Sequence, residues 1–367
     1  MRIDTRTIKA EKAVEVYISA VPTPGMDLQA QAEEVFGGIK DLLNSQNGRI
    51  LQERIFGTNQ ALETSNAVRK NVYGELDDGL DPTLLLVPEG INGQLAGVQV
   101  HAVSGHEDIQ VIRMEAEACG RIVTSGSCKY ISLSGVHVPD AGGKNDQAKM
   151  MLEKAQKILA SIGSGMLSVP RTWMWLGNIL DWYDDFNGVR NKFFIECGLI
   201  KEGAERKMPA STGIGIGPGD GSDCTMDLTA VIEPKDSIEY FDVGGNQECA
   251  YDYGSAFSRA SKAITPAGRT IFISGTAAID HTGITEHVGN AEKQIEATVE
   301  NVRAVLTEMN CGDADVVHSL IYCKTAEIEK LFVEKWGDLP WPKITAITDV
   351  CRDNLLFEIE ATAMLKA

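Results

Sequence analysis

The chain has 367 residues, enough for two or three domains of ordinary size. Hydrophobic residues make up 43% of it and charged residues 23%, which excludes a disordered or a collagen-like chain. The net charge is −18, from 34 basic and 52 acidic side chains, and a field of this sign repels nucleic-acid backbones and anionic membrane surfaces. We therefore expect neither a nucleic-acid partner nor a membrane partner.

The first residues and the cysteines favour a cytoplasmic protein. The segment MRIDTRTIKAEKAVEVYISAVP lacks the apolar core and the cleavage site of a signal peptide. No stretch approaches the roughly 18 consecutive apolar residues of a membrane-spanning helix. The eight cysteines form no CxxC pair and the six histidines no HExxH cluster, so we expect reduced, buried thiols, no metal and no cofactor.

One order of elements recurs three times along the chain, with helices and strands recognised by their apolar periodicity. The first copy has a strand at 14–21, a helix at 29–46, a strand at 50–57, a helix at 64–76, a loop from Pro82 and a strand at 94–103. The second has the same order at 130–136, 146–163, 171–179, 181–194, Pro209 and 224–232. The third has it at 271–279, 290–310, 316–324, 328–337, Pro342 and 355–365. Generic α/β alternation is the alternative, but the nearly equal spacing of the prolines favours a repeat.

The repeat predicts three tandem domains at residues 1–106, 107–236 and 237–367, with the polar segment 233–255 as the linker into the third. Each unit reads as a mixed sheet with helices on one face, an α+β fold. The other face of each sheet needs an apolar partner. Three copies in one chain can cover each other around a pseudo-threefold axis, as a monomeric pseudo-trimer or a small homo-oligomer of it.

The third copy resembles the Rid (YjgF/YER057c/UK114) family over essentially its whole length. The residues that carry this resemblance are FISGTAAI, the helix ending TVENVRAVLTEMN, the strand VVHSLIYCK and the ending WPKITAI…LLFEIEATAM. It implies a Rid/chorismate-mutase-like fold, ligand pockets between adjacent units, and hydrolysis of enamine or imine intermediates. In that family an arginine holds the substrate carboxylate and a glutamate positions water. Older family labels, endoribonuclease and translation inhibitor, fit a chain of charge −18 poorly.

The resemblance carries several functional positions onto the third copy: Lys343 for the arginine, Glu358 for the acid, Ser274 and Gly275 for the strand Ser-Gly, and Phe257 for an early aromatic residue. The arginine and acid positions fall on Ser211 and Asp227 in the second copy, and on Leu84 and Gln99 in the first. Only the third copy keeps both a cation and a carboxylate. We therefore expect one or two diverged pockets rather than three equivalent ones.

A second resemblance is to chorismatases, which hydrolyse chorismate and carry Rid-like domains in a chain of similar length. It rests on VPRTWMWLGNILDWYDDFNGVRNKFF (169–194) and on MPASTGIGIG (208–217). This resemblance implies basic residues for two substrate carboxylates and a glutamate on the last strand as the proton donor.

Two candidate sites lie near the end of the chain. Glu358 and Glu360 point to the same face of one strand, either as an acid/base group in a pocket or as a solvent-facing pair at an edge. Lys343 follows Trp341-Pro342, either as a carboxylate-binding cation or as an exposed loop lysine.

Three more candidates lie in the middle of the chain. Arg171, Trp173 and Trp175 share one strand face, either as an aromatic wall with a cation for a planar acid or as an inter-domain contact. Arg190 either binds a carboxylate or pairs with Asp184 or Glu196 on a helix surface. The glycine-dense segment 213–221 is no dinucleotide fingerprint, and is either a flexible loop or a loop folded over a pocket.

Two classes of function remain. The first is an enzyme acting on a small carboxylic acid in one inter-domain pocket, by imine or enamine hydrolysis or, alternatively, by chorismate hydrolysis. Its catalytic residues would be Glu358 and Lys343, and its substrate-binding residues Ser274, Gly275, Phe257, Arg171, Trp173 and Arg190. The second is a non-catalytic protein that binds a carboxylate metabolite, which the degraded signature of the first two copies favours.

Overall fold

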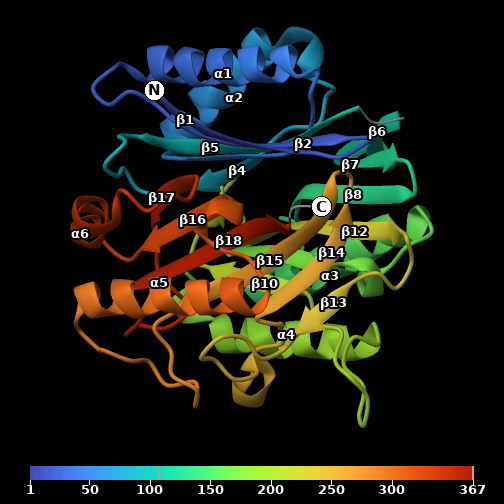
Figure 1. Cartoon of the computed structure of the whole chain (residues 1–367), viewed down its shortest axis with the longest axis vertical. Helices are drawn as coiled ribbons and strands as arrows, with labels where there is room; N and C mark the ends of the chain where they lie inside the picture. Colours follow the sequence, from blue (N-terminus) through green and yellow to red (C-terminus); the bar gives the residue numbers. More distant parts are fainter. Residues whose placement is uncertain (106–107, 366–367) are drawn as a thin grey trace.

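The computed structural model describes residues 1–105 and 108–365, in three six-stranded mixed sheets (Figure 1). The first sheet has the order β1 (Arg2–Lys9), β2 (Val14–Val21), β5 (Leu95–Ser104), β3 (Arg49–Gly57), β4 (Thr83–Leu86) and β11 (Gly217–Pro218). The second has β10 (Ala210–Ile214), β9 (Arg171–Leu176), β12 (Cys224–Glu233), β8 (Cys128–Val136), β7 (Glu117–Ser125) and β6 (Asp108–Met114). The third has β13 (Glu239–Phe241), β14 (Ala260–Thr265), β15 (Gly268–Ala277), β18 (Phe357–Leu365), β16 (Val316–Cys323) and β17 (Lys343–Ile347).

Two helices pack on one face of each sheet, on the outside of the molecule (Figure 1). They are α1 (Leu28–Ser45) and α2 (Asn59–Tyr73), α3 (Lys144–Ser161) and α4 (Tyr183–Glu196), and α5 (Ala291–Glu308) and α6 (Ala326–Trp336). Short 3-10 helices occupy Gly74–Leu76, Met166–Ser168, Ile179–Asp181, Ala250–Tyr253 and Asp313–Asp315. The predicted α+β class with three tandem units is thereby confirmed. Among the described residues, no helix combines the length and the apolarity needed to cross a membrane.

The helices form where the sequence supplies both a cap and an apolar stripe. In α5 the side chain of Asn290 accepts a hydrogen bond from the backbone N–H of Lys293, which satisfies one of the free donors at the helix start. Ile295, Val299 and Val302 recur at helical spacing and are buried against the sheet. Thr325 caps α6 in the same way.

The second face of each sheet is buried against the other two units. One apolar cluster joins Phe56 and Leu85 of the first unit to Trp175 of the second and to Leu320 and Ile344 of the third. This contact supplies the apolar partner that each sheet lacks on its own. The predicted boundary at 106/107 lies outside the described residues, and the third sheet begins at Glu239.

Three short strands follow the loop prolines and were not predicted. β4, β10 and β17 pair in parallel with β3, β9 and β16 of their own sheets. They run for only four or five residues, too few to show a clear alternation next to a proline. These strands lie where the units meet, and one of them, β10, contributes Ser211 to the candidate site.

Candidate functional site

The second and third units are joined along β10 and β15. The backbone N–H of Ser211 donates to Ser274 Oγ at 2.8 Å, and the backbone N–H of Gly275 donates to Thr212 Oγ1 at 3.1 Å. Ser274 Oγ in turn donates to the carbonyl oxygen of Ser258 at 2.5 Å. The hydroxyl of Ser274, expected to bind substrate, is therefore used to hold the two units together.

A small cavity of about 40 Å³ lies beside this contact between β10 and β15. Its walls combine a carboxyl group, two arginines, three aromatic rings and a thiol: Glu358, Arg259, Arg352, Tyr183, Tyr253, Phe257 and Cys351. Ser211, Ser255 and Gly275 complete the polar part of the lining. The cavity has room for a few water molecules, so the segments around it must open to admit a larger ligand.

Glu358 is the acid of this cavity. Only 5% of the residue is exposed, and it lies on β18 opposite Ala277 of β15. A Cβ on Gly275 would collide with Glu358 Oε1, so glycine at that position makes the space for the carboxyl group. Of the residues expected from the sequence, the structure brings Glu358, Gly275 and Phe257 together here.

Burial controls the protonation of Glu358. It raises the pKa of the carboxyl group to about 8, with a further contribution from the charge of Glu360, while Arg171 and Arg259 act in the opposite direction. The group therefore carries its proton at neutral pH. A buried carboxylic acid of this kind is suited to donating a proton.

Two guanidinium groups line the cavity, and a third lies behind its wall. Arg259 donates to the carbonyl oxygen of Glu248 at 2.9 Å and to Tyr253 Oη at 2.7 Å, and Arg352 donates to the carbonyl oxygen of Gly283 at 2.6 Å. Arg190 lies behind Phe257, with its guanidinium carbon 6.0 Å from the ring centroid. Its Nε is buried and has no hydrogen-bond partner among the described residues. Two arginines beside one uncharged acid, with Arg190 behind Phe257, make this cavity suitable for an anion.

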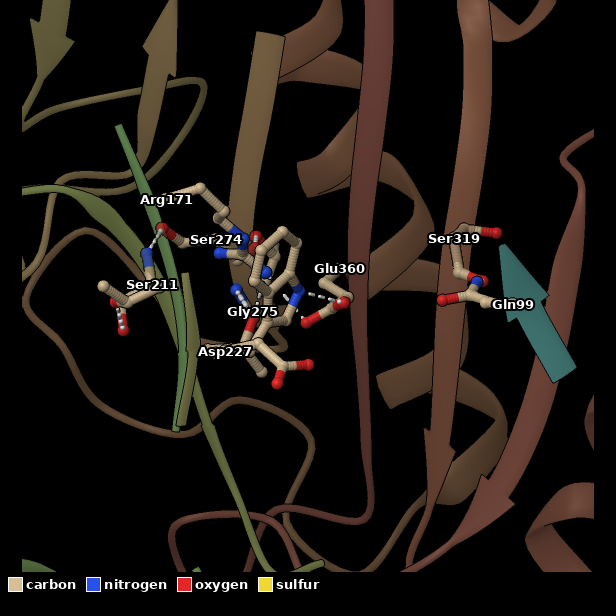
Figure 2. A network of polar contacts seen from close by, with 12 residues as sticks. Gln99, Arg171, Ser211, Asp227, Ser274, Gly275, Ser319 and Glu360 are labelled. Atoms are coloured by element: carbon tan, nitrogen blue, oxygen red, sulfur yellow. Dashed lines mark hydrogen bonds and ion pairs between the residues drawn. The ribbon is translucent and has the colours of Figure 1, made fainter. Parts of the chain in front are cut away.

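Arg171 and Trp173 do not line the Glu358 cavity. Arg171 Nη2 donates to Glu360 Oε2 at 2.8 Å (Figure 2). Trp173 Nε1 donates to Glu360 Oε1 at 2.7 Å. All three residues are buried, and the two donors come from the second unit while Glu360 comes from the third. Together they form an inter-unit contact next to the cavity.

Lys343 lies at a different interface from Glu358. Its Nζ donates to the carbonyl oxygen of Leu339 at 2.7 Å, and its own carbonyl oxygen accepts from Arg2 of the first unit at 3.1 Å. β16 separates β17 from β18 in the sheet, so Lys343 faces the first unit while Glu358 faces the second. The expected cation and acid of the third unit therefore do not share a pocket. Ser211, at the corresponding position of the second unit, lines the cavity instead.

The cleft between the first and second units has the same strand register. Met226 pairs with Val136, one residue after Ser134-Gly135, as Ile359 pairs with Thr276, one residue after Ser274-Gly275. By this register Thr225 corresponds to Glu358, and Asp227 corresponds to Glu360. The placement of Asp227 at the position of Glu358, carried over from the family resemblance, is thus off by two residues.

The remaining clefts hold different side chains. Thr225 borders a cavity of about 340 Å³ between the first and second units, which also contains His137 with its Nε2 3.0 Å from Asp220 Oδ2. Between the third and first units, a Cβ on Gly97 would lie 2.9 Å from Ile344 Cδ1, so an apolar side chain fills that space. Within residues 1–105 and 108–365, no group of three or more His, Cys, Asp or Glu side chains could hold a metal ion.

Several lining residues were missed from the sequence. Tyr253 and Ser255 come from the segment interpreted as a polar linker, and Cys351 and Arg352 follow the unpredicted strand β17. Arg259 lies two residues after Phe257. Its position beside an expected site residue was the one available signal.

Comparison with known proteins agrees with this architecture. Residues 254–365 match the family model described as endoribonuclease L-PSP. No curated protein matches the chain. Among solved structures, a chorismatase is similar with a TM-score of 0.63 and 19% identity, over 98% of this chain and 99% of that one.

Single-unit proteins match smaller parts of the chain. A putative endoribonuclease from Thermotoga maritima has a TM-score of 0.26 and 24% identity over 31% of this chain and 89% of its own. A YjgF family member from Neisseria meningitidis has a TM-score of 0.28 and 19% identity over 35% of this chain and 96% of its own. The resemblance predicted from the sequence is therefore confirmed for the third unit by the endoribonuclease L-PSP family model, and the chain as a whole shares the fold of a chorismatase.

Proposed function

We propose that the chain is a hydrolase of a small carboxylate that carries an enol ether, of the chorismate kind, with Glu358 as the proton donor. The observation that carries this proposal is the buried Glu358 carboxyl group, with its pKa raised to about 8, in a cavity bordered by arginines. The similarity to a chorismatase over nearly the whole of both chains supports the choice of substrate class.

The chemistry of an enol ether requires an acid of this type. Glu358 donates its proton to the terminal methylene carbon, and a carbocation stabilised by the ether oxygen forms at the adjacent carbon. The carboxylate left on Glu358 stabilises that positive charge. Water adds to the cation and returns a proton to Glu358. The resulting hemiketal then breaks down to a 2-oxo acid and the free alcohol of the ring.

The arginines supply the binding energy for the substrate carboxylates. A guanidinium group has five N–H donors, and Arg352 uses one of them on the carbonyl oxygen of Gly283. Arg190 keeps a buried, unpartnered Nε. Phe257 offers an apolar surface for a planar ring, and Gly275 permits its close approach to Glu358. A dicarboxylate with a flat ring fits these groups.

Imine hydrolysis is the second candidate, favoured by the family match of residues 254–365. That reaction calls for a carboxylate that positions water and for a cation that holds the substrate. The Glu358 carboxyl group is protonated at neutral pH, and Lys343 lies at another interface, bonded to Leu339. Both observations favour the acid-catalysed reaction.

We further propose that the chain works as a monomeric pseudo-trimer in the cytoplasm, with a small carboxylate as its ligand. Cyclic contacts between the units support this arrangement. Gln99 of the first unit bonds to Ser319 of the third at 3.0 Å, and Asp227 of the second bonds to Arg54 of the first at 2.6 Å. Glu360 of the third bonds to Arg171 of the second, which closes the ring.

The test is to incubate the purified protein with chorismate and follow the proton NMR spectrum. We expect the enol-ether methylene signals to disappear and the pyruvate methyl signal to appear. Glu358→Gln should lower the rate at least about 100-fold, since it removes the transferable proton, while the affinity for substrate persists. Lys343→Gln serves as the control, because the imine mechanism predicts a loss there and the proposed mechanism does not.

An unchanged chorismate spectrum would refute the proposal. Accelerated hydrolysis of an imino acid generated in the same tube by an amino-acid oxidase would then establish the second candidate. Saturable binding of chorismate without turnover would establish a metabolite-binding protein.

A further inference from the structure

We infer that Glu360 is a positioning residue for Glu358: a negative charge held in place by the second unit, which keeps the neighbouring carboxyl group in its acid form. The inference rests on the proposed role of Glu358 as proton donor and deepens it. It assigns a function to the contact that Arg171 and Trp173 make beside the cavity.

The two glutamates share one face of β18. Phe357, Ile359 and Ala361 belong to the apolar core beneath α5 and α6, so the alternate residues face the second unit. Residues two apart on a strand are separated by about 7 Å. At that distance, in a buried site, a fixed charge acts strongly on its neighbour.

Both oxygens of Glu360 are occupied by donors from β9. Arg171 Nη2 bonds to Oε2 (Figure 2). Trp173 Nε1 bonds to Oε1, so the orientation of the carboxyl group is fixed by two donors. Arg171 Nη2 also donates to Thr212 Oγ1 at 2.6 Å, and the same oxygen accepts from the backbone N–H of Gly275. Thr212 therefore links this contact to Gly275, the glycine that makes space for the Glu358 carboxyl group.

Glu360 supplies the negative charge that faces Glu358. The titratable and charged groups that surround Glu358 come from every element packed against it: Glu360 on β18, Arg171 on β9, Tyr322 on β16, Tyr183 and Arg190 on α4, Tyr253 and Arg259 before β14, and Cys351 and Arg352 before β18. Burial raises the pKa of Tyr183 and that of Cys351 to about 12, so both are uncharged at neutral pH. The charge of Glu360 raises the pKa of Glu358, whereas Arg171 and Arg259 lower it.

Removal of the Glu360 charge would therefore lower the pKa of Glu358. Arg171 would lose its counter-ion and act on Glu358 as an uncompensated cation, together with Arg259. An opposite charge nearby favours the ionised form of a carboxyl group. Glu358 would then release its proton at lower pH, and less of the acid form would remain at neutral pH.

The second unit provides a matched control. Asp227 corresponds to Glu360 and is clamped by Arg54 at 2.6 Å and Thr83 at 2.7 Å from the first unit, and by the backbone N–H of Gly135 at 2.8 Å from its own unit. Thr225 stands there in place of Glu358, so this clamp has no acid on its own strand, and it reaches the Glu360 contact only through Arg54, which stacks on the Trp173 ring at 3.8 Å. Asp227→Asn thus breaks a comparable buried inter-unit contact without removing the Glu360 charge.

The experiment is a ¹³C NMR titration of the full chain, labelled at the glutamate side-chain carboxyl carbons, without substrate. The Glu358 signal is identified by its loss in Glu358→Gln. We expect a midpoint near 8 in the unmodified protein, a midpoint lower by at least about one pH unit in Glu360→Gln, and a clearly smaller shift in Asp227→Asn. Glu360→Asp, which keeps the charge, should restore most of the original midpoint.

An unshifted Glu358 midpoint in folded Glu360→Gln would overturn the inference. An equal shift in Asp227→Asn would also overturn it, because the effect would then be a general loosening of the interfaces. If Glu360→Gln does not fold, Trp173→Phe removes one donor while keeping the charge, and any large fall in its midpoint would contradict the inference. Because the titration needs no substrate, failure of chorismate turnover would refute the proposed reaction separately.

Discussion

The cleft between the second and third units and the cleft between the first and second units share one strand register but differ in their chemistry. Each has a Ser-Gly pair on one strand and a clamped carboxylate on the next, Glu360 in one and Asp227 in the other. At the position two residues before that carboxylate, one cleft has Glu358 and the other has Thr225. The strand register and its inter-unit contact are repeated, whereas the acid is not.

The difference extends to the surroundings. Glu358 lies in a small cavity with Arg259 and Arg352, whereas Thr225 borders a cavity of about 340 Å³ with the His137–Asp220 pair at its partly exposed edge. Arginines beside an acid that keeps its proton remain available to an anionic ligand. The chemical character of each cleft therefore depends on a few side chains placed on a common strand arrangement.

The largest effect is expected from substitution of the two corresponding glycines, Gly275 and Gly135. Gly275→Ala places a methyl group against Glu358 Oε1, so the carboxyl group must leave its position and turnover should fall at least about 100-fold. Gly135→Ala is the control. Its backbone φ of 61° makes alanine unfavourable by roughly 1 kcal/mol, but the nearest neighbouring atom is 3.8 Å away and turnover should be retained. Steady-state chorismate assays compare the two, and equal losses would contradict the assignment of the site.

The next expected effect is on the pH dependence of stability. The pKa of Glu358 rises from 4.5 to about 8 on folding, so between these values the folded chain holds one more proton than the unfolded chain. The free energy of unfolding should therefore fall with rising pH in this window, by up to about 1.4 kcal/mol per pH unit, and level off above pH 8. Glu358→Gln should lack this component.

Urea unfolding of both proteins from pH 5 to pH 9 measures the difference. Thr225→Val, at the corresponding position of the other cleft, is the control and should shift stability equally at every pH. Parallel curves for Glu358→Gln and the unmodified protein would show that Glu358 ionises normally in the folded chain.

The smallest effect is expected in the cleft without the acid. His137 and Asp220 form a pair at 3.0 Å, with 30% and 44% of their side chains exposed. Exposed pairs contribute at most about 1 kcal/mol to stability. His137→Ala should therefore lower stability slightly in thermal unfolding and leave chorismate turnover unchanged. A loss of turnover as large as that of Gly275→Ala would show that this cleft takes part in the reaction.

Much of the fold could be predicted because each unit carries its own periodic signals. The stripe of Ile295, Val299 and Val302 predicted α5, and the alternation around Glu358 predicted which face of β18 it shares with Glu360. The resemblance in the third unit then indicated Glu358 and Gly275, and the structure places these two residues in contact across one cavity.

What could not be predicted depends on contacts between units. Lys343 and Glu358 lie close in sequence, yet they face different neighbours because β16 separates their strands. Ser211 reaches the cavity from another unit through β10, a strand too short to recognise beside Pro209. Tyr253 comes from a segment whose polar composition indicated a linker, and local sequence does not report what lies across an interface.

The glycine-dense segment of the second unit completes the sheet of the first unit, so the first unit is incomplete when it is expressed alone. Gly217 and Pro218 form β11, which pairs with Leu85 and Leu86 and completes the edge of the first sheet. A fragment that ends near residue 105 would lack this strip and expose the unpaired backbone groups of β4, a template for intermolecular β-pairing. Pro218 cannot donate a backbone hydrogen bond, and a proline on an edge strand limits further strand addition. The first unit thus depends on its successor for a protected edge, and expressing it alone would invite aggregation.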